Sequence, residues 1–152
     1  MKLGQRFIRD EIMIRNKKTY LFLLKLKEYI DRLNSGNNII VVEGYRDREA
    51  LINIGVKANI ICFSIIGKSF PERIEKILEI AGDREIIVLT DFDDMGIELN
   101  KNICSMIGER GGRISTLYRV KLKNILHEKN IIHIEDLNRY AYYINILSLK
   151  TS

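Results

Sequence analysis

The middle of the chain alternates between short runs of β-branched residues and stretches with helical spacing. The clearest run is Ile39-Ile-Val-Val42, whose four consecutive apolar residues indicate a strand buried on both faces. Strands that alternate with helices are joined by right-handed crossovers in a parallel sheet. The sequence therefore predicts an α/β protein with a four-stranded parallel sheet flanked by helices. The other predicted strands are residues 59–66, 85–90 and 113–117, and the helices between them are residues 47–54, 69–82 and 96–110.

Helical patterns continue on both sides of this alternating region. Apolar residues between 20 and 33 are spaced as in a helix, and Gly36 suits a left-handed exit from it. A basic helical stretch at 119–129, an apolar run at 131–134 and a helix from about residue 135 follow the last strand. We interpret residues 37–118 as the core. Basic and helical extensions at 1–36 and 119–152 pack on it to form one compact unit, and no linker separates these parts.

Composition places the chain among ordinary globular proteins. It has 152 residues, of which 46% are hydrophobic and 30% are charged. No uncharged apolar stretch reaches roughly 18 residues, the length of a membrane-spanning helix, and the first residues lack the pattern of a signal peptide. Cys62 and Cys104 stand in separate apolar segments, which is typical of buried reduced thiols rather than of a zinc site. We expect a cytoplasmic protein with no membrane partner.

The net charge of +5 is unevenly distributed along the chain. Residues 1–34 and 108–130 are rich in Lys and Arg, whereas residues 71–100 carry nine acids against three bases. An acidic centre between basic segments suits a site that binds cations and accepts polyanions. The N-terminal bases are also spaced like an ordinary exposed helix face, and they are Arg6, Arg9, Arg15, Lys17 and Lys18.

Carboxylates follow two of the predicted strands. Glu43 comes directly after the first strand, and Asp91 and Asp93 come directly after the third. Ligands of open parallel sheets bind at the carboxyl ends of the strands, so we expect these three side chains to meet at one edge. Asp91 and Asp93 can hold Mg²⁺, which prefers oxygen ligands, and Glu43 can act as a general acid or base or as a third ligand.

Neighbouring residues admit a functional and a structural interpretation. Gly44 and Gly96 would let a phosphate backbone approach closely, since neither has a Cβ. Asp93 or Asp94 can instead cap the helix that begins near Gly96, and Asp47 is more simply explained as the N-cap of its own helix.

Basic residues near the acidic cluster are candidate phosphate contacts. Arg119, Lys121 and Lys123 follow the last predicted strand and would line a path beside the site. Lys68 follows the second strand at the same sheet edge and can hold a phosphate as a point charge, although a solvated lysine explains it equally well. His127 and His133 stand alone in the sequence, and we assign them no role.

Two segments resemble the signature motifs of the Toprim domain family. One is Val41-Val-Glu-Gly44 with Asp47, and the other is Leu89-Thr-Asp-Phe-Asp-Asp-Met-Gly96. The resemblance covers about residues 38–117, and the whole chain is similar to small stand-alone Toprim proteins of archaea. The wider family includes bacterial-type primases, type IA and type II topoisomerases, and the ribonuclease that matures 5S ribosomal RNA.

The resemblance implies a Toprim (Rossmann-like) fold and a set of roles. Glu43 would be the general acid or base, and Asp91 and Asp93 would coordinate Mg²⁺, for which Mn²⁺ could substitute. Two departures stand out: Ile97 replaces a further glutamate of type IA topoisomerases, and Asp94 replaces a basic residue usual in those enzymes and in primases. The chain also lacks room for their accessory domains, so we do not expect a complete topoisomerase or primase.

These observations favour a Mg²⁺-dependent nuclease that acts on structured RNA or DNA. The alternative is a non-catalytic nucleic-acid-binding subunit of a larger processing complex, and a protein partner or a homodimer remains open. A receiver domain would need paired acids after the first strand, and a D-x-D phosphatase would place its aspartates there. In this chain the paired acids follow the third predicted strand, which disfavours both.

Overall fold

The sheet at the centre of the molecule has three parallel strands in the order β2-β1-β3. The computed structural model describes residues 16–151. Within that range the strands are β1 (Asn38–Val42), β2 (Asn59–Cys62) and β3 (Glu85–Val88). Val41 of β1 lies opposite Ile61 of β2 and Val88 of β3, so the three strands end close to one another at the carboxyl edge. The predicted α/β class with a parallel sheet is confirmed.

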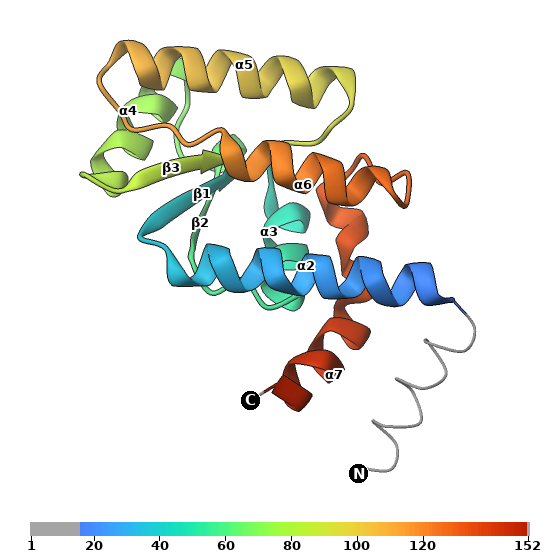
Figure 1. Cartoon of the computed structure of the whole chain (residues 1–152). Helices are drawn as coiled ribbons and strands as arrows, with labels where there is room; N and C mark the ends of the chain where they lie inside the picture. The colour runs from blue at the N-terminus through green and yellow to red at the C-terminus, as the bar shows by residue number, and fades with distance from the viewer. Residues whose placement is uncertain (1–15, 152) are drawn as a thin grey trace.

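Helices cover both faces of this sheet (Figure 1). One face is covered by α4 and α5 and the other by α2, α3 and α6, with α7 beyond them. Two short 3-10 helices, η1 and η2, complete the structure. The bounds are α2 Lys17–Ser35, α3 Tyr45–Asn53, η1 Phe63–Ile65, α4 Phe70–Ala81, α5 Asp94–Glu109, α6 Leu117–His127, η2 Ile134–Tyr140 and α7 Ala141–Thr151.

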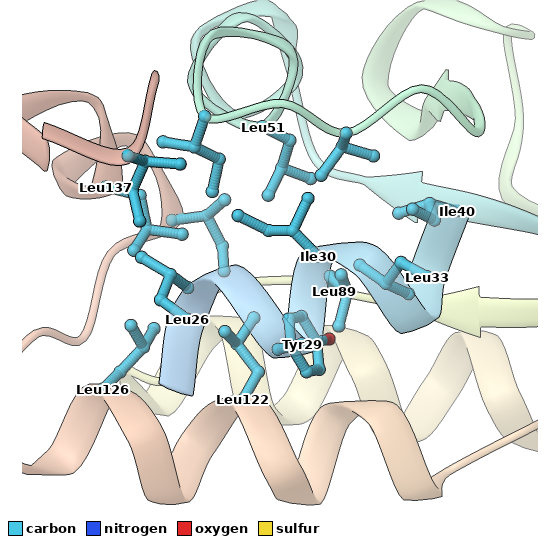
Figure 2. Close-up of a cluster of buried hydrophobic side chains, with 14 of the residues drawn as sticks. Leu26, Tyr29, Ile30, Leu33, Ile40, Leu51, Leu89, Leu122, Leu126 and Leu137 are labelled. Carbon is cyan, nitrogen blue, oxygen red and sulfur yellow. The ribbon is translucent and has the colours of Figure 1, made fainter. Parts of the chain in front are cut away.

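Alternation along β1 divides the buried residues into two cores. Ile39 and Val41 face α4 and α5, whereas Ile40 and Val42 face the core that α2, α3, α6 and η2 share. Figure 2 shows this second core, in which Leu26 and Leu122 from helices far apart in sequence meet. Because both faces of β1 are buried, its position is fixed, and so is the point at which Glu43 leaves it.

The N-terminus of α4 shows how local sequence sets an element's start. The Ser69 hydroxyl accepts a hydrogen bond from the backbone N–H of Glu72 at 3.2 Å, as the S-x-x-E spacing predicts. The Glu72 carboxylate accepts a hydrogen bond from the backbone N–H of Lys68 at 3.0 Å. Pro71 lies in the first turn, where a missing N–H costs nothing.

Four details differ from the sequence prediction. The strand expected over residues 59–66 ends at Cys62, and residues 63–65 form the 3-10 helix η1. The expected fourth strand is a single parallel bridge between Ile86 and Ile114, because Thr116 already adopts a helical conformation and α6 begins at Leu117. Gly36 leaves α2 in an extended conformation, with φ −87°, not a left-handed one. The helix expected from residue 47 begins at Tyr45.

No helix within residues 16–151 combines the length and the hydrophobicity that crossing a bilayer requires. The predicted N-terminal bases Arg6, Arg9 and Arg15 lie outside the described residues. Lys17 and Lys18 open α2 and are exposed.

Candidate metal centre

Two chain segments leave the sheet side by side at its carboxyl edge. The backbone N–H of Leu89 donates to the carbonyl of Val41 at 2.8 Å, which continues the pairing of β1 with the chain beyond β3. Glu43 follows β1 and is exposed, and its carbonyl accepts a hydrogen bond from Ser64. Asp91 follows Thr90, which is fully buried. The sheet thus places the predicted acids on one edge.

Asp91 is held by backbone from a distant part of the chain. Its Oδ1 accepts a hydrogen bond from the backbone N–H of Ile134 at 2.7 Å. The adjacent Phe92 N–H donates to the Ile132 carbonyl, also at 2.7 Å. These two bonds join the segment before η2 to the loop after β3. Oδ1 of Asp91 therefore already accepts a backbone hydrogen bond, whereas Oδ2 does not take part in these two bonds.

Asp93 combines a structural role with the predicted one. It is the N-cap of α5, and its Oδ1 accepts a hydrogen bond from the backbone N–H of Gly96 at 2.7 Å. Asp94 is the exposed first residue of the helix and not the cap. Capping occupies only one oxygen of Asp93, so the other remains available for a ligand.

His133 faces both aspartates, and the sequence interpretation missed it. Its Nδ1 lies 3.3 Å from Oδ2 of Asp91 and 3.7 Å from Oδ2 of Asp93. Ligand atoms of the three residues all lie within 4.8 Å of one another. The hydrogen bond with Asp91 and the surrounding carboxylates raise the pKa of His133 against a smaller effect of burial. The side chains are 18%, 36% and 40% exposed for Asp91, Asp93 and His133, so the cluster is open to solvent.

Arg119 holds the loop that follows β3 through its backbone carbonyls. Its guanidinium donates to the carbonyls of Thr90 and Asp91 at 2.7 and 3.0 Å and lies 4.5 Å from the centre of the Phe92 ring. The Thr90 hydroxyl donates to the Gly96 carbonyl at 2.6 Å. A Cβ on Gly96 would lie 2.1 Å from the Asp91 carbonyl oxygen. Close packing against this backbone is thus a structural reason for glycine at position 96.

Asp47 is buried beside the acids. It lies in the first turn of α3, where its carboxylate accepts from the backbone N–H of Gly44 at 3.3 Å, so Gly44 is the N-cap and Asp47 reaches back to it. The sequence interpretation of Asp47 as the N-cap is wrong, because Asp47 is the third residue of α3 after the N-cap Gly44. Burial, followed by the charge of Asp91, raises the pKa of Asp47 to about 6, and the charges of Glu43 and Glu135 add to this against the Gly44 hydrogen bond.

We expect Asp47→Asn to stabilise the protein at high pH and not at low pH. The raised pKa means that the folded chain holds this proton more tightly than the unfolded chain, so ionisation destabilises the fold as pH rises from about 4 through 6. The asparagine stays neutral and keeps an oxygen for Gly44. At pH 8 in EDTA its unfolding free energy should exceed that of wild type by about 1–3 kcal/mol. Urea denaturation between pH 4 and pH 8 measures this, and a pH-independent difference would contradict it.

The predicted basic residues lie at three separate places on the molecule. Arg119 and Lys123 line a cavity of about 260 Å³ between α5 and α6, next to Phe92. Lys121 lines a different hollow, between α6 and α2, because residues two apart on a helix face different sides. Lys68 is exposed just before α4. A Cβ on Gly44 would meet only the Ser64 hydroxyl, at 3.8 Å, so the backbone there is approachable.

The donor set fits a divalent cation. Asp91 and Asp93 each have one oxygen fixed by a backbone N–H and the other directed towards the same imidazole nitrogen. Such outer hydrogen bonds orient ligating carboxylates. The fold and the cluster together define an α/β protein with a candidate divalent-metal centre at the carboxyl edge of its parallel sheet.

Comparisons with known proteins agree with this class. The chain belongs to the Toprim domain family, whose sequence model matches residues 38–125. It is 37% identical over 126 residues to a UPF0292 protein of Thermococcus sibiricus, covering 83% of this chain and 94% of the relative. It is 36% identical over 119 residues to a UPF0292 protein of Methanocaldococcus jannaschii, covering 77% and 90%.

A solved structure has the same fold. A protein from Aquifex aeolicus superimposes with a TM-score of 0.58 at 30% sequence identity, covering 73% of this chain and 96% of its own. Toprim domains bind divalent metal and typically interact with nucleic acids, so membership and the cluster together indicate metal-dependent nucleic-acid processing.

Proposed function

We propose that this protein is a nuclease that uses Mg²⁺ or Mn²⁺ to cleave phosphodiesters in structured RNA or DNA. The observation that carries the proposal is that Glu43, Asp91 and Asp93 follow strands that end at the same sheet edge, and that Oδ2 of each aspartate is not bonded to a backbone N–H and faces His133. The metal cluster itself contains Asp91, Asp93 and His133, and the Glu43 carboxylate is not part of it. Family membership supports the nucleic-acid substrate. Exposure of Glu43 supports a role in proton transfer, since a reacting group needs access to substrate and water.

The proposed mechanism divides the work among a few side chains. Asp91 and Asp93 would hold the cation, which would supply electrostatic stabilisation of the phosphate and of the leaving oxygen. Glu43 takes a proton from the attacking water or gives one to the leaving oxygen. Gly44 leaves space for the phosphate backbone beside Glu43. Arg119 fixes the carbonyls of the metal-binding loop, so that both aspartates keep their geometry.

Basic side chains would guide the nucleic acid to this centre. Lys123 is exposed at the cavity beside Phe92, and Arg119 lines the same cavity. Lys68, exposed just before α4, and Lys121, in the hollow between α6 and α2, would add positive charge elsewhere on the surface. Phosphate contacts of this kind give affinity that falls with salt and carry no sequence preference.

A cleavage assay tests the proposal directly. End-labelled single-stranded, duplex and hairpin RNA and DNA are incubated with the protein in Mg²⁺, Mn²⁺ or EDTA. We expect cleavage that requires metal and falls below detection in Asp91→Asn/Asp93→Asn. Both asparagines keep an oxygen for the Ile134 and Gly96 N–H groups, so the loop should keep its shape.

Asp83→Asn is the matched control and should cleave like wild type. Asp83 is an exposed aspartate in the turn before β3, at the opposite end of that strand. Binding without cleavage in every metal would instead identify a non-catalytic nucleic-acid-binding subunit.

A further inference from the structure

The imidazole of His133 lies where a third ligand of the metal centre would be. Its Nδ1 is the atom that faces the two aspartate oxygens, at 3.3 Å from Asp91 and 3.7 Å from Asp93. Each aspartate has its other oxygen bound to a backbone N–H. Oδ2 of Asp91, Oδ2 of Asp93 and Nδ1 of His133 therefore face the same space.

The separations match those of ligands around one ion. Metal–ligand distances of about 2.0–2.2 Å place neighbouring ligand atoms about 2.8–3.6 Å apart, in octahedral to tetrahedral geometry. The two distances from Nδ1 are close to this range, and all three ligand atoms lie within 4.8 Å of one another. A cation could bind all three after side-chain shifts of at most about an ångström.

The segment that carries His133 is fixed on both sides of it. Ile132 accepts a hydrogen bond from Phe92 N–H, and Ile134 donates one to Asp91, both at 2.7 Å. Ile131 and Ile134 are buried in the core shared with α2 and α6. The backbone at His133 is thus held in place by these hydrogen bonds and by the packing of its buried neighbours.

We propose that His133 is a third protein ligand of the metal centre, through the lone pair of its Nδ1, and that it makes the centre selective for Mn²⁺ over Mg²⁺. Mg²⁺ prefers oxygen ligands and retains its waters, whereas imidazole suits the later first-row transition ions and is accepted by Mn²⁺. The inference rests on the metal centre of the proposed function. It concerns which ion binds and does not require that the protein cleave nucleic acid.

Mn²⁺ binding to the full chain tests this assignment. Pulsed electron paramagnetic resonance detects ¹⁴N coupling when an imidazole nitrogen ligates Mn²⁺. The sequence contains two histidines, so His127→Gln assigns the signal. His127 lies exposed at the end of α6 and outside the cluster. We expect the coupling in wild type and in His127→Gln, and its loss in His133→Gln.

Affinities measured by calorimetry provide the second readout. We expect His133→Gln to weaken Mn²⁺ binding by at least about ten-fold and Mg²⁺ binding by less than about three-fold. Circular dichroism in EDTA checks that the variant is folded. Should it fail to fold, the ¹⁴N measurement on wild type and His127→Gln still decides.

Two results overturn the inference. One is Mn²⁺ bound without ¹⁴N coupling, and the other is equal loss of Mn²⁺ and Mg²⁺ affinity in folded His133→Gln. In either case His133 only ties the C-terminal segment to Asp91. The nuclease proposal fails on a different result, namely the absence of cleavage with metal bound.

Discussion

Gly96→Ala should unfold the metal-binding loop, with the largest stability loss of the single substitutions considered. A methyl group at this position would lie 2.1 Å from the Asp91 carbonyl oxygen and 2.6 Å from its carbon. Both are backbone atoms, and the same peptide is held by Arg119 and followed by the Phe92–Ile132 hydrogen bond. The clash therefore cannot be relieved by turning a side chain.

The expected loss is about 2–4 kcal/mol of unfolding free energy. For a chain of this size that corresponds to a Tm lower by roughly 5–15 °C in EDTA. Metal affinity should fall by at least about ten-fold as well, because Asp91 and Asp93 both border the displaced peptide. Thermal denaturation and calorimetry measure the two effects.

Gly108→Ala on the same helix is the matched control. Gly108 is exposed within α5, and a Cβ there would meet nothing within 4 Å. Replacing glycine by alanine in an open helical position stabilises by roughly 0.5–1 kcal/mol. The same chemical change should thus have opposite signs at the two positions. Gly96→Ala with the stability of wild type would show that the loop after β3 can move as a unit.

The sequence was sufficient for the strands whose residues are buried on both faces. Residues 39–42 and the apolar part of residues 85–90 are continuous β-branched or leucine runs, and both proved to be strands. The run from 113 to 117 has the same composition in part, yet only Ile114 pairs with the sheet. Thr116 already has a helical conformation and leads into α6. A segment of five residues is too short for its hydrophobic pattern to distinguish a strand from the start of a helix.

The candidate site was predictable only where it depends on the strand ends. Glu43, Asp91 and Asp93 follow strands, so the parallel topology alone brings them to one edge. His133 lies 42 residues beyond Asp91 and follows no strand of the sheet. Its apolar neighbours at 131–134 indicate burial, but not the side of the molecule on which they pack. Only the tertiary fold joins this segment to Phe92.

The spacing of the basic residues along the helix could have separated them by face, but the sequence prediction did not use it. Arg119 and Lys123 are four apart and share one face of α6, whereas Lys121 is two from each and faces α2. Arg119 is also engaged with two carbonyls and the Phe92 ring, which a sequence cannot show. Its direct contact with phosphate remains a prediction, and its support of the loop is an observation.

Glu43→Gln should lower the rate of metal-dependent cleavage by about 10²–10⁴-fold at saturating metal. Glu43 is exposed, and its only described hydrogen bond uses the backbone carbonyl, which accepts from Ser64. The glutamine has the same size and cannot take or give a proton as a carboxyl group does. The fold should therefore be unchanged while the chemical step slows.

Single-turnover cleavage and Mn²⁺ calorimetry on the same variant separate the two roles open to Glu43. A slow rate with metal affinity within about three-fold of wild type identifies a general acid or base. A matching loss of affinity identifies a metal ligand instead. Glu79→Gln, an exposed glutamate near the end of α4, is the control and should cleave normally. A Glu43→Gln rate close to that of wild type would remove Glu43 from the mechanism, and proton transfer would then fall to solvent or to another group beside the cation.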